Sequence, residues 1–259
     1  MSSTEPDVLF TINDSGNEPL LFAIDTTGAD RGVWRVRRST NVDWEALAIG
    51  PCRKTGVTRC IYIGDVGDND GKHRTRTIYR VAEPRAKGAA FVGTLTAERV
   101  TFTYPDNRHD VEAMYVSPTG DVVLITKRPL RTLFRHLRPA LVFRIPASAW
   151  SRTRDVVAVL SDSLSIVPGS SPLRTITDAS LSPDGLHLAV RTYSQLFVYA
   201  TDSSSGLVRS SVAPAICDLT SLGEGQGEGI AWMNTSGRFV FSSEGRAAHL
   251  HLASCPLPR

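Results

Sequence analysis

A motif that recurs four times restricts the fold of this 259-residue chain more than any other feature. Each copy contains an acidic residue, a short apolar run, a turn rich in Ser, Pro, Gly or Asn, and a second apolar run. The copies are VDWEALAIGP with RCIYIGDVGDN, HDVEAMYVSPTGDVVLITKR, ITDASLSPDGLHLAVRTY and QGEGIAWMNTSGRFVFSSEG. A third apolar run follows each of them: RTIYRVAEP, ALVFRIPAS, SQLFVYATD and AAHLHLAS. Such internal repeats indicate a fold built from similar units.

The repeated unit has the properties of β-strands. Short apolar runs between turn signals are typical of strands that are buried on both faces. The turns SPTG and SPDG suit tight connections, because proline presets φ early in the turn and glycine supplies a positive φ late in it. We therefore predict an all-β fold, a β-propeller of five blades, in a single domain over residues 1–259. Six blades remain an alternative, since residues 140–172 are long enough to contain further strands. A β-sandwich would explain the strands but not the acid before every hairpin.

The beginning of the chain resembles an incomplete copy of the unit. DVLFTINDSGN matches a second strand with its polar end, and LLFAIDTTG matches a third strand. A first strand and its acid are absent before them, and a fourth strand is absent after Cys255. We expect that the N-terminal part of the first blade is missing from this sequence, and that an upstream segment with a signal peptide completes the ring.

Composition restricts the functional class. Hydrophobic residues make up 41% and charged residues 21% of the chain, which is ordinary for a soluble globular protein. A formal net charge of +3, with basic residues spread along the chain, gives no argument for nucleic-acid binding. No apolar run approaches the ~18 residues that a transmembrane segment needs. The first ten residues carry no basic or apolar region of a signal peptide.

The four cysteines indicate the redox compartment. Their even number and their positions in loops favour disulfides Cys52–Cys60 and Cys217–Cys255, and thus an oxidising compartment. Inert free thiols are the alternative. A zinc site is disfavoured because no pair has CxxC spacing and no histidine cluster accompanies them.

Several motifs together resemble a family of secreted bacterial β-propeller proteins that has no established activity. They are NDSGN, VDWEALAIGP, IGDVGDN, IYRVAEP, DVEAMYV, ITK and QGEGIAW with SSEG, and they cover the chain from Asp7 onward. Ala46 stands where the family usually has a second acid after Glu45, which weakens a role for two adjacent carboxylates. The acid-before-strand repeat is more distantly similar to calcium-dependent propeller hydrolases, namely β-propeller phytases, calcium-activated apyrases and the gluconolactonase group.

The repeated acids predict a metal site at one end of the propeller channel. Equivalent residues of different blades form rings, and antiparallel pairing brings the start of each first strand beside the end of the second. Carboxylate and amide oxygens are the ligands that Ca²⁺ prefers. The metal candidates are Asp14, Glu45, Asp65, Glu112, Asp178, Glu228 and Glu244, and the candidates for contact with a bound ligand are Asn13, Asn17, Asp68 and Asn69.

Ion pairs provide an account of the same acids without a metal. Glu112 could pair with Lys127, and Asp178 with Arg191. In a hydrolase these cations would stabilise developing negative charge while calcium activates water. The catalytic candidates under that hypothesis are Glu112, Glu228, Lys127 and Arg191.

Three other segments carry weaker signals. GDVGDNDGK lacks the order of acids of an EF-hand and is expected to be a loop after a strand. His249 and His251 are expected to form a surface pair. RPLRTLFRHLRP, residues 128–139, is expected to be a solvated insertion in the third blade, with a surface for an anionic partner as the alternative.

The sequence therefore predicts a secreted or periplasmic propeller, expected to be a monomer. Its acidic face is expected to bind Ca²⁺ and a small-molecule or extracellular ligand. A calcium-dependent hydrolase of phosphoesters or lactones and a non-catalytic interaction scaffold are the alternative functions.

Overall fold

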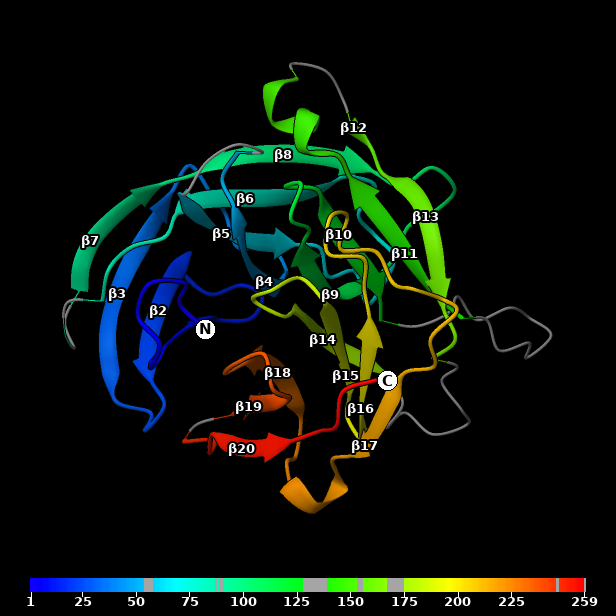
Figure 1. Cartoon of the computed structure of the whole chain (residues 1–259). Coiled ribbons are helices and arrows are strands. Elements are labelled where there is room, and N and C mark those ends of the chain that lie inside the picture. The colour runs from blue at the N-terminus through cyan, green and yellow to red at the C-terminus, as the bar shows by residue number, and fades with distance from the viewer. Residues whose placement is uncertain are drawn as a thin grey trace.

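Five sheets arranged around a central axis make up the fold, so the chain is a five-bladed β-propeller (Figure 1). The structure is a computed structural model, and it describes residues 1–53, 58–86, 88, 91–127, 139–152, 156–166, 175–245 and 247–258. The sequence prediction of an all-β propeller with five blades is confirmed.

Each blade is one sheet, and we number the blades in chain order from the inner strand outward. Blade 1 contains β1 (Val8–Ile12), β2 (Leu20–Asp25), β3 (Asp30–Arg37) and β7 (Phe91–Thr96). Blade 2 contains β4 (Trp44–Pro51), β5 (Arg59–Asp65), β6 (Arg76–Ala82), β8 (Glu98–Thr103) and β12 (Val156–Val157). Blade 3 contains β9 (Val111–Val116), β10 (Val122–Thr126), β11 (Ala140–Ile145) and β13 (Val159–Leu164).

The last two blades follow the same plan. Blade 4 contains β14 (Ile176–Leu181), β15 (His187–Thr192), β16 (Gln195–Ala200) and β17 (Ala215–Asp218). Blade 5 contains β18 (Gly227–Trp232), β19 (Arg238–Ser243) and β20 (His251–Ser254). Among the described residues, two short 3-10 helices lie outside the sheets, η1 (Ala147–Ser151) and η3 (Thr220–Leu222). Neither helix has the length and apolar character that crossing a bilayer requires, nor does any other described helix.

The repeated hairpins form because their strands are apolar on both faces. All residues of β9 and β10 are buried, and the SPTG turn joins the two strands. In that turn the Gly120 N–H donates to the Ser117 carbonyl, and Gly120 has a φ of 85°. The SPDG turn of blade 4 repeats this bond between Gly185 and Ser182. Turn chemistry and double-sided burial therefore account for the hairpins.

Blades 1 and 2 each receive their outermost strand from a chain segment that crosses over from the following blade. After β6 the chain crosses to blade 1, where β7 pairs in parallel with β3, and then returns to blade 2 as β8. After β11 it crosses back to blade 2, where β12 pairs in parallel with β8, before β13 completes blade 3. The strands found in residues 140–166 thus complete existing blades instead of forming a sixth.

Both expected disulfides are present. Cys52–Cys60 closes the β4–β5 hairpin, and Cys217–Cys255 links β17 of blade 4 to the end of β20 in blade 5. The described cysteines include no free thiol. The arginine-rich segment at positions 128–138 lies outside the described residues.

Candidate metal site on the acidic face

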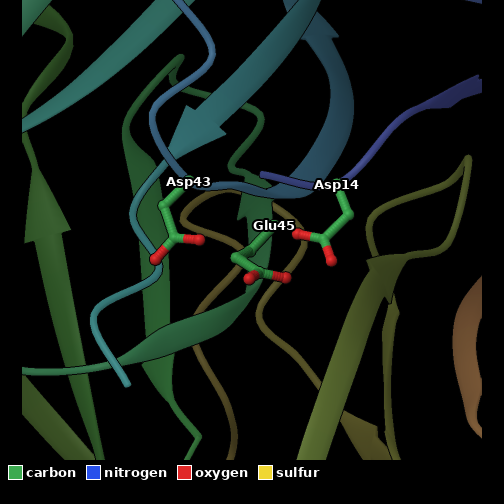
Figure 2. A group of neighbouring side chains, drawn as sticks. All are labelled: Asp14, Asp43 and Glu45. Atoms are coloured by element: carbon green, nitrogen blue, oxygen red, sulfur yellow. The ribbon is translucent and has the colours of Figure 1, made fainter. Parts of the chain in front are cut away.

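Three carboxylates converge where blade 1 meets blade 2. Asp14 follows β1, Asp43 directly precedes β4, and Glu45 is the second residue of β4. One oxygen of each carboxylate lies within 4.8 Å of the others. Figure 2 shows Glu45 between Asp43 and Asp14, with the three side chains facing a shared space. Oxygens that bind one Ca²⁺ at about 2.3–2.6 Å lie within about 5 Å of one another, so this geometry fits a calcium ion.

Backbone hydrogen bonds fix Asp43 in this position. The N–H of Asp43 donates to Asp65 Oδ1 at 2.7 Å, and the N–H groups of Val66 and Gly67 donate to the Asp43 carbonyl at 3.1 and 3.3 Å. Gly67 also packs directly against the two carboxylates. A Cβ at position 67 would lie 2.5 Å from Glu45 Cγ and 2.6 Å from Asp43 Oδ2. The loop after β5 therefore packs against Asp43 and Glu45 and fixes their positions.

Asn41 connects the two loops that supply the acids. Its Nδ2 donates to the carbonyls of Asn13 and Asp14, at 3.1 and 2.8 Å, while its Oδ1 accepts the Trp44 N–H at 3.1 Å. Asn17 Nδ2 also donates to the Asp14 carbonyl at 3.1 Å. The predicted ligand-contacting residues Asn13 and Asn17 thus belong to the loop that positions Asp14.

The electrostatics of the site disfavour three unscreened charges. Burial, followed by repulsion from Asp14 and Asp43, raises the pKa of Glu45 to about 8. Burial also raises the pKa of Asp43, and Asp110 and Asp14 add to the effect against the opposing influence of Arg76. Like charges packed without a cation have this effect on carboxyl groups.

A second acidic pair lies in blade 5. The Tyr193 hydroxyl donates to Glu228 Oε1 at 3.1 Å. Burial and then repulsion from Glu244 raise the pKa of Glu228, and Asp14 and Lys127 are close enough to contribute. Glu228, Glu244, Asp14 and Glu45 all line one cavity of about 1110 Å³.

Other predicted site residues are bound by protein groups. Glu112 forms an ion pair with Lys127, whose ammonium also lies 3.9 Å from Asp110 and donates to Asn69 Oδ1 at 3.4 Å. The carboxylate of Asp68 lies 3.4 Å from Arg76 and accepts the N–H groups of the following loop. Apart from Asp14 and Glu45, the acids named from sequence are thus not part of the three-carboxylate cluster.

Asp178 and Arg191 of blade 4 both form contacts with blade 5 or the loop before it. Asp178 accepts the N–H groups of Ala179 and Ile230, both at 2.7 Å, and so links β14 to β18. Arg191 is fully buried and pairs with Glu224 at 2.7 Å. Its guanidinium also donates to the carbonyl of Gly229 at 2.8 Å. The predicted pair of Asp178 with Arg191 is therefore replaced by two separate contacts with blade 5.

Sequence reasoning missed Asp43, although a signal for it was present. The repeats VDWEA and HDVEA both have an aspartate two residues before the acid of the motif. In blade 3 that aspartate, Asp110, accepts the Asp68 N–H at 2.7 Å and lies near Lys127. In blade 2 no described cation lies this close to the corresponding Asp43, whose carboxylate faces Glu45 and Asp14.

Comparison with known proteins finds only distant structural likeness. No protein-family model matches the chain, and no curated protein matches its sequence. Among solved structures it is similar to a chain in a complex of KlAtg21 with the coiled-coil of AgAtg16, with a TM-score of 0.40, 10% identity and 96% of this chain covered. It is also similar to a chain of YCF48 bound to D1 peptide, with a TM-score of 0.35, 10% identity and 88% coverage. A eukaryotic initiation factor matches with a TM-score of 0.32, 7% identity and 98% coverage. The matches span 70%, 58% and 61% of the lengths of those chains, and likeness at this level says nothing about ligands or activity.

Proposed function

We propose that this chain is a calcium-binding propeller whose acidic face holds a ligand through the metal. The observation that carries the proposal is the convergence of Asp14, Asp43 and Glu45, with one oxygen of each within 4.8 Å of the others. Two of these residues line the cavity, so a cation held there would face it. Calcium takes six to eight oxygen ligands, and positions beyond the carboxylates would remain for backbone, water or an oxygen-bearing ligand.

Two disulfides support the expectation of a secreted or periplasmic protein, because such bonds persist in oxidising compartments. The motif resemblance to the secreted bacterial propeller family belongs to the same proposal. An extracellular setting also supplies calcium at the concentrations that weak sites require.

Binding is favoured over hydrolysis by the positions of the candidate catalytic cations. Arg191 is fully buried beneath blade 5, and Lys127 is engaged by Glu112. Neither is free in the described structure to neutralise charge on a substrate. We therefore propose ligand binding without chemistry as the function of this face.

The test is direct binding of the metal. Terbium should replace calcium and luminesce on excitation of Trp44, which stands between Asp43 and Glu45 in the sequence. Calcium should also raise the midpoint of thermal unfolding relative to EDTA, because it binds the folded state. Asp43→Asn and Glu45→Gln should abolish both signals, whereas the exposed Asp30→Asn should retain them. An unchanged midpoint in the wild-type protein, or a calcium response that survives both substitutions, would contradict the proposal.

A further inference from the structure

The inner position of blade 1 differs from that of the other blades in the direction of its strand. In blade 2, β4 starts at the acidic face, and β5 pairs with it antiparallel and ends at the same face. Asp14, which follows β1, lies beside Glu45 at the start of β4. The strand β1 therefore runs toward the acidic face as β5 does, and it matches a second strand rather than an inner one.

No described strand pairs with the inner edge of β1. In the part of the chain that the structure describes, β1 pairs with β2 alone, while β4, β9, β14 and β18 occupy the inner positions of the other blades. Residues before β1 form backbone hydrogen bonds with it only at Val8, which donates to the Glu5 carbonyl and accepts the Ser2 N–H. The backbone from Leu9 to Ile12 is left without a strand on its inner side.

The hydrophobic cores show the same gap. Four clusters of buried residues join blades 1 and 2, 2 and 3, 3 and 4, and 4 and 5. Among the described residues no such cluster joins blade 5 to blade 1. The ring is therefore packed at four seams, and the fifth lacks an apolar core of its own.

The cavity of about 1110 Å³ is the central channel, lined by the inner strands of all five blades and by Met1–Thr4, and Leu9–Ile12 of β1 border it at the fifth seam. In Figure 1 the seam separates the blue strands of blade 1 from the orange and red strands of blade 5. The apolar side chains that line this channel include Leu9, Phe10, Ile12, Leu47, Ile230 and Phe241. An unpaired strand edge offers backbone hydrogen bonds to an added strand, and an apolar cavity beside it offers space for that strand's side chains.

We propose that this cavity accepts one extended polypeptide strand from outside residues 1–259, added antiparallel to β1 in the inner position of blade 1. The other inner strands have six to eight residues, so the added strand has about that length. Backbone groups of β1 supply hydrogen bonds, and apolar side chains of the added strand fill the cavity. A second folded copy does not fit, because its edge strands cannot reach a position next to the propeller axis.

A peptide with the sequence of a sister inner strand tests this proposal. The probe is acetylated and amidated HDVEAMYVS, which contains β9. The control is the same peptide with proline in place of its alanine, which disrupts strand pairing. Amide exchange is measured at Leu9–Ile12 and, for comparison, at β20, whose outer edge is also unpaired among the described strands.

The expected result is slower exchange at Leu9–Ile12, by about 100-fold when free peptide is about 100 times its Kd, with little change at β20. The proline peptide should give no protection. Equal protection by both peptides, protection at β20 instead, or none at all would overturn the proposal. Protection that grows with protein concentration without peptide would identify a second copy as the occupant and would also overturn it. Calcium binding is measured separately, so either proposal can fail alone.

Discussion

The disulfide between blades 4 and 5 should matter more for stability than the one within blade 2. Cys217 and Cys255 are 38 residues apart, whereas Cys52 and Cys60 are 8 apart in one hairpin. Loop-closure entropy then gives a contribution of about 4 kcal/mol for the long link and about 2.5 kcal/mol for the short one. The structure points the same way, because described core residues attach blade 5 to blade 4 only.

The assay compares two double variants in which both cysteines become alanine. Urea unfolding gives the free energy of unfolding of each, and amide exchange reports blade 5 separately. We expect the Cys217/Cys255 variant to lose about 1.4 kcal/mol more than the Cys52/Cys60 variant and to exchange faster throughout β18–β20. Equal losses, or unchanged exchange in blade 5, would refute the reasoning that this disulfide retains the last blade.

Three further predictions follow from single contacts. Gly67→Ala should weaken calcium-dependent stabilisation, because its Cβ would displace Glu45 and Asp43. Gly225→Ala should leave it unchanged, because no atom lies within 4 Å of the added Cβ. Calorimetric titration with calcium measures both variants. Burial raises the pKa of Asp178 from 3.8 to about 7, so its folded carboxyl keeps a proton that the unfolded one has lost. Stability should therefore fall by up to about 4 kcal/mol as pH rises from about 4 to about 7, and Asp178→Asn should flatten urea midpoints across that window. Lys127→Met should lower the free energy of unfolding by about 3–5 kcal/mol, because it leaves Glu112 buried without its partner. Adding Glu112→Gln should recover much of that loss. Urea unfolding of both variants measures the two changes.

The repeat made the architecture predictable because the sequence of each hairpin contains the local signals for its strands and its turn. Double-sided apolar runs and the SPTG and SPDG turns are local signals, and they matched β9–β10 and β14–β15. The exchanged strands β7 and β12 were not predicted. Each leaves its own blade to pair in parallel with a neighbour, and parallel partners leave no local turn signal.

An acidic cluster on one face was predictable from the sequence, but its members were not. The sequence predicted Asp14 and Glu45 on one face, and for Asp178 it offered either a metal or an ion pair with Arg191. The partner of Arg191 is Glu224, which belongs to the loop before β18. That contact depends on Gly227, since a side chain there would overlap the guanidinium. An ion pair between two blades that depends on a glycine for space cannot be recognised from the sequence spacing of the residues alone.

The acids at equivalent positions of the repeat make different contacts because their neighbouring residues differ. Glu112 pairs with Lys127 within blade 3, and Asp178 accepts two backbone N–H groups, one of which links β14 to β18 of blade 5. Glu45 faces Asp14 and Asp43 instead, where blade 1 meets blade 2. A carboxylate in that position gains most from a cation, because nothing described nearby offers it a positive charge as close as the one Glu112 has. Repetition thus supplied the acids, and the groups that neighbour each acid determine which of them the protein itself pairs.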